Sequence, residues 1–161
     1  MKNLSLYTWT TSLLALFSGG SLIVLFVLVP FWHSMESAEL IQFFKRFGGR
    51  IAAVMLPMEV FPLVLSFLAY SAARKNNADE RKLWLSVNIS NILILLTLFV
   101  YFIPVNLSFI NATISRDDVP AELIRWQIVH GIRTLLTLVS AVLAILALSK
   151  LIKERAAHGQ N

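Results

Sequence analysis

Two charged side chains and one histidine stand inside stretches of sequence that are otherwise apolar. Glu59 lies within "RIAAVMLPMEVFPLVLSFLAYSAA", and His130 and Arg133 lie within "RWQIVHGIRTLLTLVSAVLAILAL". A neutral histidine accepts a proton near pH 7. An arginine beside it stabilises the oxyanion that develops when an enolisable or phenolic substrate is deprotonated. These residue types therefore suit proton abstraction from an acidic C–H or O–H group of a hydrophobic substrate.

Four apolar segments must position these side chains. They cover residues 12–32, 51–73, 83–103 and 124–148. About 20 helical residues cross the hydrocarbon core of a bilayer. Because 57% of the 161 residues are hydrophobic and only 14% are charged, the sequence predicts an all-α, polytopic membrane protein. We expect one domain, residues 1–161, built as a bundle of four transmembrane helices at about residues 8–32, 50–74, 82–103 and 120–154.

The charged residues of the second and fourth segments are expected at the same depth. Glu59 is nine residues past Arg50, and Arg133 is nine residues past Ile124. At 1.5 Å per residue, both would lie about 13 Å from the same side of the membrane. Since charge is costly in lipid, both should face the interior of the bundle, and we predict that they pair. The alternative is a purely structural pair that fixes helix register, because buried pairs add little net stability.

Polar and aromatic side chains from the third and fourth segments are expected around one cavity in the outer half of the membrane. Trp126, His130 and Arg133 share one stripe of the fourth helix, which should point into the bundle. Trp126 and Tyr101 offer flat surfaces to an aromatic ligand. We predict catalytic roles for Glu59, His130 and Arg133, and substrate-binding roles for Tyr101, Asn106 and Trp126.

A metal site is not expected, because one intramembrane histidine and one glutamate fall short of a usual ligand set. The predicted chemistry needs no cofactor. One alternative stays open, a haem held by His130 and by His33 at the end of the first segment.

Both outer loops carry local signals. Residues 40–47 have apolar side chains at near-helical spacing, which predicts a short interfacial helix in the first outer loop, ended by Gly48 and Gly49. Pro104 is expected to end the third helix and to open the second outer loop.

The end of the third segment and the start of the fourth also resemble a known family. The pattern P-x-N at Pro104 and Asn106, followed by W-x-x-x-H-x-x-R at Trp126, His130 and Arg133, is similar to that of the anthrone-oxygenase-like family of small four-helix membrane proteins. The likeness covers about the last 60 residues. It implies a four-helix fold and, for some members, oxidation of an anthrone to an anthraquinone without a metal or organic cofactor. By this resemblance His130 would be the base, Arg133 and Asn106 would hold the oxyanion, and Trp126 would stack on the substrate ring.

Charge and composition bear on location and partners. If both termini are cytoplasmic, eight Lys and Arg residues lie on that side and five on the other, with Arg133 counted in neither. This asymmetry favours both termini inside, and the short loops favour a bacterial inner membrane. The net charge of +5 sits at helix ends, so it does not indicate nucleic-acid binding, and the absence of cysteine excludes thiol chemistry. Expected partners are membrane lipid, a hydrophobic small molecule and a second copy of the chain.

Two functions compete on this evidence. The first is a cofactor-independent oxygenase or related oxidoreductase that acts on a lipophilic aromatic compound, anthrone-like or quinol-like. The second is a non-enzymatic accessory subunit, carrier or small-molecule-binding protein that uses the same cavity. A haem or quinone electron-transfer subunit is a third alternative.

Overall fold

The computed structural model describes residues 2–76 and 78–158, and the described part is helical without strands. Residues 1, 77 and 159–161 of the predicted domain lie outside this description. Four helical spans are long and apolar enough to cross a membrane, which confirms the predicted all-α class: Leu4–His33, Ser37–Lys75, Arg81–Ile110 and Val119–Ala157.

Three of the four spans contain a π-helical stretch. The first span comprises α1 (Lys2–Ile23), η1 (Val24–Leu28) and α2 (Val29–His33). The second comprises α3 (Ser37–Phe43), η2 (Phe44–Gly48) and α4 (Gly49–Lys75), and the third comprises α5 (Arg81–Thr97), η3 (Leu98–Phe102) and α6 (Ile103–Ile110). The fourth span is the single helix α7 (Val119–His158).

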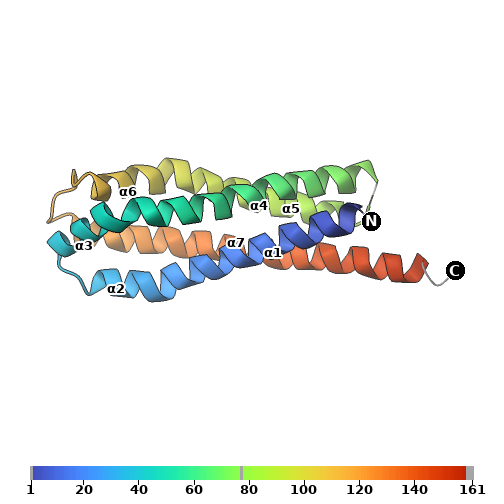
Figure 1. The fold of residues 1–161 in the computed structure, drawn as a ribbon, viewed down its shortest axis with the longest axis horizontal. Helices are drawn as coiled ribbons and strands as arrows, with labels where there is room; N and C mark the ends of the chain where they lie inside the picture. The colour runs from blue at the N-terminus through green and yellow to red at the C-terminus, as the bar shows by residue number, and fades with distance from the viewer. Residues whose placement is uncertain (1, 77, 159–161) are drawn as a thin grey trace.

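The spans run up and down in an elongated bundle, so that α1 begins and α7 ends at the same end (Figure 1). We call this the terminal end; the opposite, loop end carries the connections at residues 34–36 and 111–118. Helix α1 packs against α4 and α7, and α5 packs against the same two helices. Consequently α4 and α7 lie diagonally across the bundle, as do α1 and α5.

The two ends of the bundle are packed with different side chains. At the terminal end small residues let the helices approach closely, and this core includes Ala69, Ala73, Ala141, Ala144 and Ala147 with Tyr7 and Trp84. At the loop end the core is aromatic, with Trp32, Phe44, Phe102, Phe109 and Trp126. Large apolar side chains such as Phe26, Phe67 and Val100 point outward and are mostly exposed, as expected for helices that face lipid.

Polar side chains near the middle of the bundle are hydrogen-bonded to one another. The Ser66 hydroxyl donates to the Asn88 amide oxygen (3.2 Å) and accepts from the Asn91 amide (3.1 Å), and Ser140 donates to Asn91 (2.9 Å). These bonds link α4, α5 and α7. Since a one-residue slip of any of these helices would leave buried polar groups unpaired, this layer fixes their register.

The prediction that Gly48 and Gly49 end a separate interfacial helix is wrong. Both glycines have ordinary right-handed helical backbone angles, and α3 continues through η2 into α4. A glycine is needed at position 48 because α6 comes close to the backbone there. A Cβ atom at this position would lie 2.8 Å from Cγ1 of Ile110 on α6. Gly48 therefore lets the second and third spans touch at the loop end.

The prediction that Pro104 ends the third helix is also wrong, because the helix continues to Ile110. The π-helical stretches η1 and η3 each end two residues before a proline, Pro30 and Pro104. Proline has no N–H to donate to the carbonyl four residues back, and its ring clashes with that carbonyl. The widened turn places the Val29 N–H on the Val24 carbonyl and the Ile103 N–H on the Leu98 carbonyl, so the chain stays helical around each proline.

Candidate functional site

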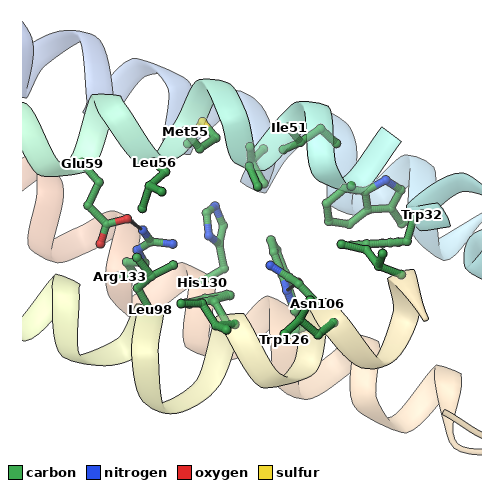
Figure 2. Close-up of a pocket in the computed structure, with 18 residues that line it drawn as sticks. Trp32, Ile51, Met55, Leu56, Glu59, Leu98, Asn106, Trp126, His130 and Arg133 are labelled. Carbon is green, nitrogen blue, oxygen red and sulfur yellow. Dashed lines mark hydrogen bonds and ion pairs between the residues drawn. The ribbon is translucent and has the colours of Figure 1, made fainter. Parts of the chain in front are cut away.

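A cavity of about 210 Å³ lies in the half of the bundle nearer the loop end. It is bounded by α4 and η2 on one side and by η3 and α6 on the other, with α7 and the first span behind (Figure 2). All three π-helical stretches contribute lining residues, in keeping with the frequent occurrence of π-bulges at functional sites. The lining is mainly apolar, and the side chains in it that carry polar groups are Trp32, Glu59, Asn106, Trp126, His130 and Arg133.

An ion pair closes the deep end of the cavity. The Arg133 Nη2 donates to Glu59 Oε2, as the matched depths predicted, and both residues are buried. The guanidinium also lies over the Phe102 ring, 4.8 Å from its centroid. Glu59 Oε1 and Arg133 Nε are buried without a hydrogen-bond partner among the described residues. The pair is thus neutral as a unit but keeps one acceptor and one donor unsatisfied.

His130 has a defined tautomer. Its Nε2 lies 3.1 Å from the backbone carbonyl oxygen of Ser21 on α1. A carbonyl oxygen only accepts hydrogen bonds, so in the neutral ring Nε2 carries the proton and Nδ1 carries the lone pair. Nδ1 is buried and has no hydrogen-bond partner in the described part of the chain, and the side chain lines the cavity between the ion pair and the tryptophans (Figure 2). The ring therefore holds a free basic nitrogen.

Trp126 holds the His130 ring in place. The two rings are stacked, with centroids 4.8 Å apart and an interplanar angle of 23°. The indole Nε1–H donates to Asn106 Oδ1 (3.0 Å), and this bond fixes the rotation of the indole. This bond uses one lone pair of Asn106 Oδ1, so Asn106 can offer a ligand the other lone pair and its NH2 group. One face of Trp126 is likewise occupied by His130, so that face is not a free platform for a substrate ring.

Three groups were missed by sequence reasoning, two that line the cavity and one that holds a lining residue. Trp32 packs edge-on against Trp126 (5.1 Å), and Phe102 does the same from η3 (5.2 Å). The third is the Ser21 carbonyl, within the "SGGS" stretch of α1. A tryptophan near a helix end is typical of a membrane interface, and a serine among glycines is typical of close helix packing, so neither pattern indicated a site.

Two residues expected at the cavity lie outside it. Tyr101 does not line the cavity; its hydroxyl donates to Glu122 Oε1 (2.7 Å), and its neighbour Phe102 occupies the inward position instead. His33 is exposed and hydrogen-bonds through Nε2 to Gln127 (2.8 Å), away from the cavity lining. The structure therefore does not bring Tyr101 together with the other predicted substrate-binding residues, and His33 and His130 do not face one haem-sized site.

Among the described residues, no group of three or more His, Asp or Glu side chains is placed to hold a metal ion.

Comparison with known proteins adds no identity, since no protein-family model, curated protein or solved structure matches the chain. The fold and the cavity define a four-helix protein with spans of membrane-crossing length and a polar site enclosed between them.

Proposed function

We propose that the protein binds a neutral, lipophilic aromatic molecule in this cavity and removes a proton from it with His130 Nδ1. The observation that supports the proposal best is the hydrogen bond from His130 Nε2 to the Ser21 carbonyl, which leaves the lone pair of Nδ1 unused on a side chain that lines a mainly apolar cavity. A general base needs both a lone pair and a substrate within reach. A cavity of about 210 Å³ suits a ligand smaller than the usual drug-sized molecule.

Arg133 is proposed to stabilise the anion formed by proton removal. Its guanidinium lines the cavity next to His130 and retains an unpaired Nε–H. Glu59 is proposed to orient the guanidinium through the ion pair, and the Asn106 NH2 to donate to the same oxygen. Preorganised donors of this kind are worth more in an enclosed apolar site than in water.

The reaction we propose is the oxidation of an anthrone-like or quinol-like compound. Loss of a C–H proton from an anthrone to His130 gives a carbanion whose charge lies mainly on the ring oxygen. The carbanion reacts with O2 to a peroxide anion, which takes the proton back from His130; the resulting hydroperoxide loses water to leave a quinone carbonyl. One anthrone and one O2 thus give one anthraquinone and one water. The Pro104, Asn106, Trp126, His130 and Arg133 pattern, which resembles that of the anthrone-oxygenase-like family, supports this choice of substrate.

A binding protein without turnover is the second candidate. One observation favours it: Arg133 is already paired with Glu59, so its positive charge stabilises a developing anion less. In either case we propose that the four helices span a bacterial inner membrane with both termini in the cytoplasm, an orientation supported by the distribution of basic residues.

The test is an absorption assay on detergent-purified protein in air. We expect addition of anthrone to produce anthraquinone faster than in detergent with a heat-denatured sample. If the protein binds anthraquinone but does not speed the oxidation of anthrone, the enzymatic function is rejected in favour of the binding function.

A further inference from the structure

The cavity is bordered on one side by exposed apolar residues from two helices. Ala52 and Leu56 on α4 face Ile103 and Leu107 of the third span across this border, and all four line the cavity and are exposed. The helices are antiparallel, so Ala52 and Leu107 are each one turn from the Gly48–Ile110 contact, and Leu56 and Ile103 are two turns away. The border is therefore about two helical turns long, and its exposed side chains are apolar, with the half-buried Asn106 between Ile103 and Leu107.

The cavity is closed toward both ends of the bundle. At the loop end Gly48 meets Ile110, Phe44 stacks on Phe109 (4.8 Å), and Trp32 packs on Phe44 (5.0 Å). Toward the terminal end the Glu59–Arg133 pair is followed by the hydrogen-bonded layer around Asn91. On the side of the terminal end, helix α4 packs against α5, and on the side of the loop end, η2 packs against α6. The border lies between these two contacts.

We infer that ligands enter and leave sideways, through a portal between α4 and the third span formed by Ala52, Leu56, Ile103 and Leu107. In a bilayer this side lies against lipid, so the ligand must be a neutral molecule dissolved in the membrane. A charged or strongly polar ligand would lose its hydration at the apolar border without gaining a partner. This inference rests on the proposed binding function, because it names the class of ligand that the cavity admits.

A reversible clamp across the portal tests the inference. The chain has no cysteine, so Leu56→Cys together with Ile103→Cys gives one defined pair. A bismaleimide with a reducible spacer joins them in vesicle-reconstituted protein. Anthraquinone is the probe: it lacks an acidic C–H and undergoes no turnover, so entry is measured independently of catalysis. Its arrival quenches the fluorescence of Trp32 and Trp126, read in a Trp9→Phe, Trp84→Phe background.

We expect the clamp to slow anthraquinone uptake about tenfold or more, and to retain the probe when it is applied after loading. Reduction of the spacer should restore the original rate, which separates closure of the portal from damage to the fold. Each single-cysteine variant, treated with the same reagent, should be affected far less. Uptake within twofold of the unclamped rate, at complete cross-linking, would overturn the portal. Failure of anthrone oxidation with a working clamp effect would instead reject only the enzymatic function.

Discussion

The ion pair between Glu59 and Arg133 joins α4 to α7, the two helices that lie diagonally across the bundle. Diagonal helices share little direct packing, so this pair ties together elements that are otherwise connected through their neighbours. It also forms the deep end of the cavity, with His130 one turn away from Arg133 on α7. The pair thus links the stability of the bundle to the position of the group proposed to stabilise the anion.

Removing one partner of this pair should be much more costly than removing both. Glu59→Leu or Arg133→Met alone leaves a buried charge unpaired, and we expect each to lower the free energy of unfolding by about 3–5 kcal/mol. The double variant should recover most of the loss, because no unpaired charge remains. Equilibrium unfolding in mixed detergent micelles measures the three values. Additive losses in the double variant would contradict a direct pair.

Gly48 and Gly49 provide a matched test of the contact at the loop end. Gly48→Ala puts a methyl group 2.8 Å from Ile110 Cγ1, and we expect a loss of about 1–3 kcal/mol in the free energy of unfolding. Gly49→Ala meets nothing within 4 Å and should be neutral or stabilising by up to about 1 kcal/mol, because alanine favours a helix. Ile110→Ala should relieve the first variant. Equal effects at the two glycines would refute the close approach.

Trp126 is expected to act through His130. Trp126→Phe keeps a stacked ring but removes the hydrogen bond to Asn106, so the orientation of the imidazole loosens. We predict that kcat for anthrone oxidation falls about fivefold, the equivalent of about 1 kcal/mol, while KM changes little. Trp9→Phe is the control, because Trp9 is exposed on α1. A rise in KM with unchanged kcat would assign Trp126 to substrate binding instead.

Tyr101 should be dispensable for activity. Tyr101→Phe removes the 2.7 Å bond to Glu122, outside the cavity, and we expect it to cost about 1–2 kcal/mol in the free energy of unfolding. Activity per folded molecule, from kcat normalised to the folded fraction, should stay within about twofold of the native value. A tenfold loss of kcat in fully folded Tyr101→Phe protein would show that Tyr101 acts in the substrate site.

Helix number, the class of protein and the Glu59–Arg133 pair could be predicted from the sequence, because each follows from apolar length or from depth along a helix. The sequence could not predict which side of the third helix faces the cavity. The expectation for Tyr101 rests on its residue type and its place near the end of the third segment, whereas its neighbour Phe102 lines the cavity.

The backbone contribution of Ser21 was equally hidden. A carbonyl oxygen is present at every residue, so nothing in "SGGS" distinguishes the one that His130 reaches. The continuation of the helix through Gly48 was missed for a related reason: glycine is both a common helix terminator and the residue that permits close contact. Only the position of Ile110 decides between the two roles.

The most direct test of the central claim is the rate of anthrone oxidation by the His130→Gln variant. Glutamine can still donate to the Ser21 carbonyl but has no basic nitrogen. We predict that kcat falls about 100-fold or more, while anthraquinone binds within about twofold of its native affinity. A variant that binds anthraquinone and oxidises anthrone at the native rate would show that His130 is not the base.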